Sequence, residues 1–296
     1  MMVSSKFLWF SLLVSTVTLL PVPTRAAMNS LHSSAEVTPA DSQVIAQRRR
    51  TSSSPFKPRK SQPKPKYTVG GGRRSREVCL QDEAALSKTS PKPLNQMLTP
   101  LLPRNPSPPD LQLTLAERPT LTVYVPQTSA KAFEFTLYAQ EGEAERVIYQ
   151  ANQALPQTPA IVQFTLPKDA PVLEIGKNYV WVVTLACNTA HPEPRDLSAV
   201  VHPDPSDPSV GELIRRIEPD SALANQLKRV TGLDLARLYG ESGIWYDMVS
   251  TLVALRHHEH KDTTATNLWD DLLQSNGLAE LKDAPLATPP SQTGGN

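Results

Sequence analysis

The stretch Asn178-Tyr-Val-Trp-Val-Val-Thr-Leu-Ala-Cys187 carries the strongest strand signal in the chain. Most of its residues are Val, Thr, Tyr or Trp, which fit a pleated, half-buried surface. Side chains alternate across a strand, so Tyr179 and Trp181 share one face while Val180 and Val182 share the other. Since both faces are apolar, we expect a central strand that is covered on both sides.

The residues that lead into this strand, Leu173-Glu-Ile-Gly-Lys-Asn-Tyr179, resemble the tyrosine corner of fibronectin type III and immunoglobulin-like sandwiches. In such a corner the tyrosine hydroxyl bonds to upstream backbone and fixes the turn into the strand. A plain turn before a buried strand is the alternative. The corner predicts a hydrogen bond between the Tyr179 hydroxyl and the backbone a few residues upstream.

Further strand signals recur at the spacing found in β-sandwiches. They lie at residues 111–115, 120–125, 132–139, 146–150 and 161–166, with candidate last strands at 197–202 and 210–217. Proline-rich connections separate them. The pattern predicts an immunoglobulin-like β-sandwich over residues 77–218.

The chain then changes to a helical period. Pro219-Asp220-Ser221 is a helix start signal, Gly240 is expected to end a short helix, and Gly277 is a later stop. The apolar stripes predict helices at residues 233–239, 244–256 and 268–274, with residues 278–286 packing back. The expected fold class is therefore mainly β with α: the sandwich, a docked helical subdomain at 219–286, and a disordered tail at 287–296.

The first 26 residues have the pattern of a signal peptide. Lys6 precedes an apolar run at residues 7–20, which is short for a membrane span, and Thr24-Arg-Ala26 offers small residues at a cleavage site. An uncleaved anchor is the alternative. We expect an exported protein that is periplasmic or extracellular.

Residues 27–76 have the composition of a disordered arm, rich in Ser, Pro, Lys, Arg and Gln. Eleven Lys and Arg residues and no acid lie between Ser42 and Arg76, so the net charge of +1 hides a basic arm on an acidic body. A solvated linker is the simplest interpretation. Weak electrostatic contact of the arm with anionic surfaces is also expected, whereas export argues against a nucleic-acid partner.

Several motifs in a fixed order resemble the bacterial family Domain of Unknown Function 928. They are Gly70-Gly-Gly-Arg-Arg, Cys79, Leu98-Thr-Pro-Leu-Leu-Pro103, residues 118–126, residues 173–181, Cys187 and Tyr239-Gly-Glu-Ser-Gly-Ile-Trp-Tyr-Asp247. The resemblance covers about Val69 to Leu286. The resemblance implies an architecture and an envelope or periplasmic role. Because the family has no established activity, it implies no catalytic residues.

The residues that carry chemistry are sparse. Two cysteines in an exported protein predict a disulfide between Cys79 and Cys187, with two free buried thiols as the alternative. His257-His-Glu-His260 lacks the spacing of a zinc protease helix, and Gly240-Glu-Ser-Gly243 is one residue short of a nucleophile elbow. We therefore assign no catalytic, metal or cofactor-binding residues and expect no cofactor.

The helical region contains more aromatic and apolar side chains than short helices bury among themselves. Trp245, Tyr246, Asp247 and Trp269 are therefore a candidate partner surface, with burial in the core as the alternative. The resulting hypothesis is a non-enzymatic envelope or periplasmic interaction module that binds a protein or an envelope polymer. The alternatives are a cell-envelope hydrolase with unidentified carboxylates and a structural envelope protein tethered by its basic arm.

We predict that export removes residues 1–26, because the apolar run is short and small residues follow it. N-terminal sequencing of the exported protein should begin at or near Ala27. A membrane-bound product that retains Met1 would contradict the cleavage.

Overall fold

The computed structural model describes residues 54–59, 78–85, 91–104, 111–142, 144–187, 207–258 and 263–287. Contacts divide the chain into residues 1–50 and 51–296, and every described residue belongs to the second unit. The predicted signal peptide, most of the predicted arm, the candidate strand at 197–202 and residues 288–296 lie outside the described residues.

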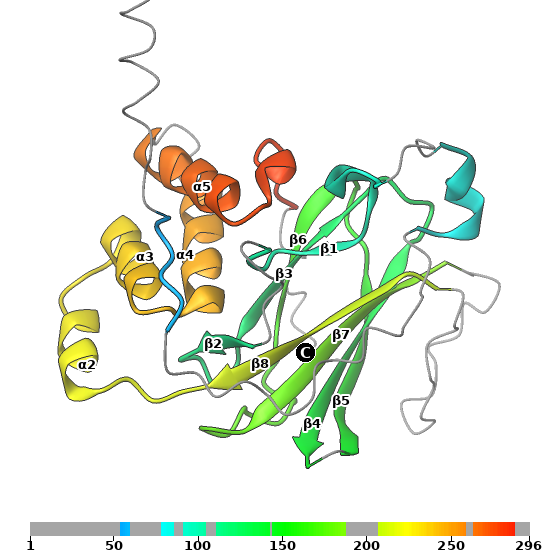
Figure 1. The fold of residues 1–296 in the computed structure, drawn as a ribbon. Helices are drawn as coiled ribbons and strands as arrows, with labels where there is room; N and C mark the ends of the chain where they lie inside the picture. The colour runs from blue at the N-terminus through cyan, green and yellow to red at the C-terminus, as the bar shows by residue number, and fades with distance from the viewer. Residues whose placement is uncertain are drawn as a thin grey trace, which may run out of the picture. The chain divides into compact units, whose positions relative to one another are not determined.

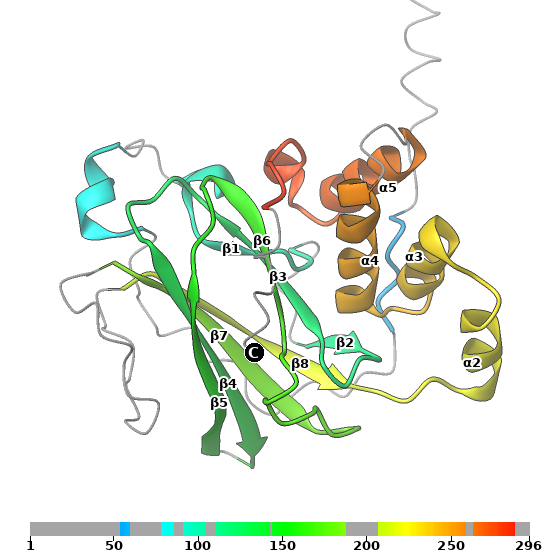
Figure 2. The ribbon, with the colours of Figure 1, turned by 180° about the vertical axis from the view of Figure 1, so that it is seen from behind.

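Two β-sheets form the body of this unit (Figures 1 and 2). One has the order β1-β3-β6 and the other has the order β2-β8-β7-β4-β5. The strands are β1 (Thr99–Pro100), β2 (Gln112–Thr114), β3 (Thr120–Val125), β4 (Ala132–Glu141), β5 (Ala144–Ala154), β6 (Ala160–Thr165), β7 (Asn178–Ala186) and β8 (Ser209–Arg216). Neighbouring strands are antiparallel except β2 and β8, which are parallel.

Strand β7 occupies the middle of the five-stranded sheet, as the sequence predicted. Trp181 is fully buried on the face that joins the main core. On the other face Val180 and Val182 pack in a second cluster with residues such as Leu213 and Tyr138. The expectation of a strand covered on both sides is confirmed.

The turn into β7 is held by the predicted tyrosine bond. The Tyr179 hydroxyl accepts a hydrogen bond of 3.0 Å from the Glu174 N–H, five residues upstream. Leu173 is fully buried beneath the turn, and Gly176 adopts φ = +79°, a conformation that favours glycine. The spacing of Leu, Gly and Tyr therefore sets this corner.

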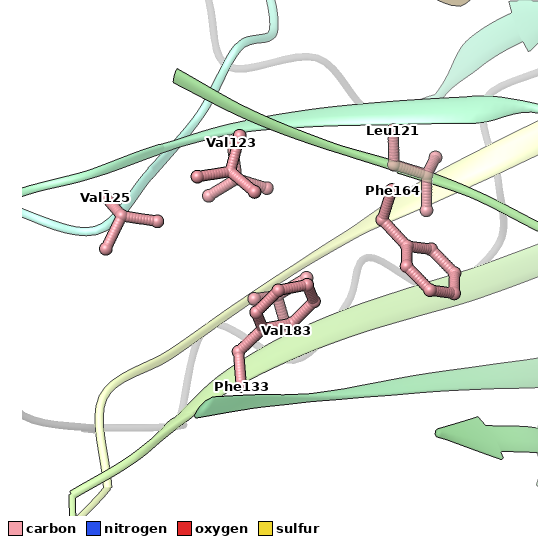
Figure 3. Close-up of a pocket in the computed structure, with 7 residues that line it drawn as sticks. Leu121, Val123, Val125, Phe133, Phe164 and Val183 are labelled. Atoms are coloured by element: carbon pink, nitrogen blue, oxygen red, sulfur yellow. The ribbon is translucent and has the colours of Figure 1, made fainter. Parts of the chain in front are cut away.

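Apolar side chains from the two sheets meet face to face. The rings of Phe135 and Phe164 stack with their centroids 4.2 Å apart. A cavity of about 10 Å³ lies between the sheets near Val123, Phe133 and Val183 (Figure 3). That volume corresponds to roughly one water-sized sphere, so we treat it as a packing gap in the core and not as a ligand site. The predicted fold class, a sheet-rich body followed by helices, is confirmed.

The helical region begins at the predicted signal. The helices are α2 (Ser221–Leu227), α3 (Gly232–Glu241), α4 (Trp245–His258) and α5 (Thr263–Ser275), with short 3₁₀ helices η1 (Leu80–Ala85), η2 (Leu94–Gln96) and η3 (Ala279–Leu281). The Asp220 side chain caps α2 by accepting a 2.8 Å bond from the Leu223 N–H.

One expected helix stop is wrong. Gly240 does not end α3, which continues to Glu241. The chain turns at Gly243 instead, where φ is +69°. The later stop is confirmed, because Gly277 follows α5 with φ = +75°.

The chain after α5 packs back onto the sandwich, as expected. Leu278 and Leu281 are fully buried, and Leu286 pairs with Ile161 of β6. The Ala287 N–H donates to the Ile161 carbonyl at 2.9 Å, so the first residue of the predicted tail is still part of the fold. Among the described residues, no helix has the length and apolar character needed to cross a membrane.

Cys79 and Cys187 form the predicted disulfide, and neither cysteine is free. The bond joins the end of β7 to the segment before η1, across 108 residues of sequence. Thr128 lies beside it, with its hydroxyl 3.6 Å from the Cys79 sulfur. The bond therefore ties the entry of the fold to its central strand.

We predict that replacing both Cys79 and Cys187 by Ser lowers the free energy of unfolding by up to about 4 kcal/mol, because a long closed loop restricts the unfolded chain. Urea unfolding of the folded, oxidised protein checks the size of the loss. Mass spectrometry of the unreduced folded protein should find no alkylatable thiol, and two labelled cysteines would falsify the pairing.

Candidate functional site

The first turn of α4 attaches the helical region to the sandwich. The Trp245 Nε1–H donates to the Leu101 carbonyl at 2.7 Å. The Trp181 Nε1–H of β7 donates to the Tyr246 hydroxyl at 2.8 Å. Helix α4 also contacts β2 and β3. Adjacent residues thus bond to different parts of the sandwich.

Asp247 completes this attachment. Its carboxylate accepts a 3.2 Å hydrogen bond from the Leu115 N–H, just after β2. Burial nevertheless raises the pKa of Asp247 to about 6, although hydrogen bonds from Thr114 and from the Leu115 and Ala116 backbone oppose the rise. The Asp247 side chain therefore links α4 to the β2–β3 loop by hydrogen bonds.

The predicted partner residues lie mostly inside the protein. Trp245 and Trp269 are 0% exposed and Tyr246 is 3% exposed, while Asp247 is partly exposed. Docking of the helices on the two sheets and packing between the helices bury these aromatic side chains. Their burial argues against a contact with a partner through these rings.

Trp269 is held between α4 and the C-terminal segment. The Arg256 guanidinium lies 4.8 Å from the centre of its ring, a cation–π arrangement. The Trp269 Nε1–H donates to the Lys282 carbonyl at 3.4 Å. This ring is a structural element of the helical region.

The turn between α3 and α4, residues 242–244, lies beside part of the predicted arm. Ser54–Arg59 runs between α3 and α4, in blue in Figures 1 and 2. The Lys57 N–H donates to the Gly240 carbonyl at 2.9 Å, and the Arg59 Nε–H donates to the Ser242 carbonyl at 2.8 Å. The expectation of a disordered arm over residues 27–76 is therefore wrong for these six residues.

Phe56 anchors this segment. Its side chain is 4% exposed, and its ring meets the Trp245 ring edge to face at 4.8 Å. At the segment's start, the Ser54 hydroxyl accepts hydrogen bonds from the Ser275 hydroxyl at 3.0 Å and from the Asn276 side chain at 3.4 Å. A buried ring explains why a polar, basic stretch takes one position here.

Two glycines let the segment approach. A Cβ atom at Gly240 would lie 2.5 Å from the Pro55 carbonyl oxygen, and one at Gly243 would lie 2.8 Å from the Lys57 carbonyl oxygen. Either distance is too short for a real contact. Gly240 therefore serves close backbone approach and not helix termination. We call the surface formed by residues 240–243, Trp245, Ser275 and Asn276 the arm site.

The segment is suited to an extended form by its own residues. In Pro55-Phe-Lys-Pro58 each proline fixes its own φ and restricts the residue before it to extended conformations. Such a chain resembles polyproline II, which loses little conformational entropy when it binds. Phe56 is also the one aromatic residue between Ala27 and Lys66. That isolated ring was the signal in the sequence for this site.

A second partly buried carboxylate lies near the same junction. Glu212 of β8 is the cross-strand partner of Trp181. Burial raises the pKa of Glu212 to about 7, while the positive charge of Arg104 opposes the rise. Its negative charge is thus unfavourable in the folded protein at neutral pH.

The two motifs considered for metal and nucleophilic chemistry lie at opposite ends of α4. Within the part of the chain that the structure describes, no three His, Cys, Asp or Glu side chains lie close enough together to hold a metal ion. His257 and His258 are the last residues of α4, and the rest of the histidine cluster lies outside the described residues. Ser242, of the Gly240–Gly243 motif, uses its carbonyl to accept Arg59.

Fold and motifs agree with the sequence comparisons. The family Domain of Unknown Function (DUF928) matches residues 69–286, which is more than half of the chain, and the chain belongs to this family. A comparison with curated proteins found no match. The matched range contains every residue of the arm site, whereas Ser54–Arg59 precedes it.

We predict that the free energy of unfolding falls as the pH rises from 4.5 to about 7, the ordinary and the folded pKa of Glu212. Below this window the carboxyl is protonated in both states. Within it the unfolded chain loses its proton first, and above it the folded state carries a buried charge. Glu212→Gln should remove the part of this fall that Glu212 causes, so that the variant is more stable than the natural protein above pH 7 and about equal below pH 4.5.

Urea unfolding across this pH range measures the effect. Glu145→Gln is the matched control, because Glu145 is exposed on β5. Asp247 acts in the same direction at lower pH, so a smaller fall persists in the Glu212 variant. Parallel pH curves for Glu212→Gln and the natural protein would contradict the assignment.

Proposed function

We propose that the chain is an exported, non-enzymatic interaction module of the envelope or periplasm, and that it binds an extended peptide segment at the arm site. The observation that carries this proposal is the way Ser54–Arg59 is held. One buried aromatic ring, one backbone hydrogen bond and one arginine account for its main contacts. These are the contacts of a peptide ligand on a folded domain.

The chemistry of the site favours a particular class of peptide. A proline-flanked aromatic residue enters beside Trp245, and a basic residue three positions later meets the Ser242 carbonyl. Recognition of polyproline-like segments by aromatic surfaces follows the same principle, because the ligand is already extended. The proposed ligand is therefore an extended segment of the type Pro-Phe-Lys-Pro-Arg.

The position of the segment outside the family range supports this interpretation. The acceptor residues belong to the matched domain, and the occupant belongs to the preceding arm. Ser54–Arg59 therefore binds the arm site as a peptide ligand would, and the intervening chain tethers it to the domain. The arm's bases also favour weak contact with anionic surfaces of the envelope.

The leader pattern at residues 1–26 and the disulfide support export, since disulfides persist in oxidising compartments. The sandwich itself is immunoglobulin-like in this proposal. Strands β8, β7, β4 and β5 take the places of G, F, C and C′ opposite β1-β3-β6, and the tyrosine corner stands at the start of β7. Sandwiches of this kind commonly serve as binding modules.

The hydrolase alternative finds less support among the described carboxylates. Asp247 is bonded to backbone of the β2–β3 loop, which suits a structural role. Glu212 lies beside Tyr246, whose hydroxyl is already engaged by Trp181. An interaction module accounts for the same residues without a reaction.

We predict that Phe56→Ala frees the arm site, because the buried ring is the segment's main anchor. A labelled synthetic peptide of residues 51–62 should bind the exported variant with a dissociation constant in roughly the micromolar to millimolar range. The natural protein should bind it more weakly, by about tenfold for a dissociation constant near 0.1 mM and by more for tighter binding, because its own tethered segment competes at an effective concentration of roughly millimolar order. Fluorescence anisotropy measures both.

Two controls make the result specific. A peptide with Ala in place of Phe56 should not bind, and a protein with the exposed Leu80 changed to Ala should behave like the natural one. Circular dichroism establishes that the Phe56 variant is folded. A folded variant that ignores the peptide would overturn the proposed site.

A further inference from the structure

We propose that a second copy of this chain is a partner for the arm site. Ser54–Arg59 of one copy occupies the arm site of another, so that two copies are joined by exchange of their arms. This inference rests on the proposed function, because it uses the same site. The proposed ligand is the segment Ser54–Arg59, whose ring contact and hydrogen bonds with the arm site are present in the structure.

The contacts of Ser54–Arg59 do not require that the segment and the arm site belong to the same chain. The segment's hydrogen bonds to the rest of the described chain go to Gly240 and Ser242, around the α3–α4 turn, and to residues at the end of α5. All four of these hydrogen-bond partners are in the helical region. The same contacts form whichever copy donates the segment.

The covalent connection also allows exchange. Eighteen residues, 60–77, separate Arg59 from Val78, the next described residue. Fully extended, a connection of this length spans at most about 60 Å, which is more than the diameter of a small domain. Chain connectivity therefore does not decide which copy a segment enters.

Charge favours the meeting of an arm with the helical region of another copy. Eleven bases and no acid lie between Ser42 and Arg76, whereas ten acids and six bases lie between Asp220 and Asp283. Opposite net charges raise the rate of encounter, and salt weakens this attraction. The specific contacts of Phe56 and Arg59 then fix the register.

Concentration sets the balance between the two arrangements. A tethered segment faces its own site at an effective concentration of roughly millimolar order, so dilute chains keep their own segments. Exchange prevails where chains are crowded to a comparable density, as on a surface that gathers them. If the exchange is reciprocal, each copy is both donor and acceptor, and the assembly closes as a two-fold dimer.

Two variants separate donation from acceptance. Phe56→Ala removes the donor and leaves the arm site open. Gly240→Ala blocks the site, because the new Cβ meets the Pro55 carbonyl, while alanine favours the helix in which it lies. The Met248 side chain must also move slightly, and circular dichroism checks that the fold is kept.

Each exported variant should be monomeric alone, since neither can both give and accept a segment. Mixed at equal concentration, they should form a one-to-one complex, measured by light scattering after size separation. Its dissociation constant should lie within about tenfold of that of the synthetic peptide, because the contacts are the same. Phe56→Ala mixed with a chain carrying both substitutions is the control and should stay monomeric.

The outcomes distinguish the two proposals. If the synthetic peptide binds Phe56→Ala but the mixture stays monomeric, arm exchange is overturned and the proposed peptide site stands. If neither the peptide nor the second chain binds, the proposed site fails as well. A complex that forms equally with the doubly substituted chain would show another interface and would also overturn arm exchange.

Discussion

The first turn of α4 is the point on which the rest of the structure depends. Trp245, Tyr246 and Asp247 follow one another, and each bonds to a different part of the sandwich. A helix turn distributes successive side chains around its axis, so three consecutive residues fix the orientation of α4. Because Gly240 and Gly243 lie just before this helix, the same short stretch also shapes the arm site.

This attachment explains why polar atoms lie so deep in an apolar junction. A buried indole N–H or phenol hydroxyl is costly unless it has a partner. Trp181 donates to Tyr246, whose hydroxyl lies 3.4 Å from the Leu213 carbonyl, so the bonds run from β7 through α4 to β8. Such a satisfied network specifies one arrangement of helix on sheet, whereas apolar contact alone allows sliding.

Local signals were enough to predict the sheet-rich body and the start of the helical region, because strand alternation, the Tyr179 corner and the cap at Asp220 depend on neighbouring residues. The burial of Trp245 and Trp269 did not follow, since an apolar surplus has the same appearance whether a sandwich or a partner covers it. The docking of Phe56 was missed for a related reason. The arm was predicted to be disordered from its average composition. Such an average does not register a single ring that packs on Trp245, almost two hundred residues later in the chain.

The energetics of the segment argue for a ligand-like role over that of a fixed part of the core. Burying the Phe56 ring contributes about 1.5–3 kcal/mol, and each net hydrogen bond adds about 1 kcal/mol. Ordering one residue's backbone costs about 1–2 kcal/mol, a cost that Pro55 and Pro58 reduce because their φ angles are already fixed. Over six residues the favourable and unfavourable contributions differ by only a few kcal/mol, so the segment without its tether binds weakly. Occupancy of the arm site therefore depends on the tether and on the local concentration of segments, which is the condition under which a bound segment can be replaced by another of the same kind.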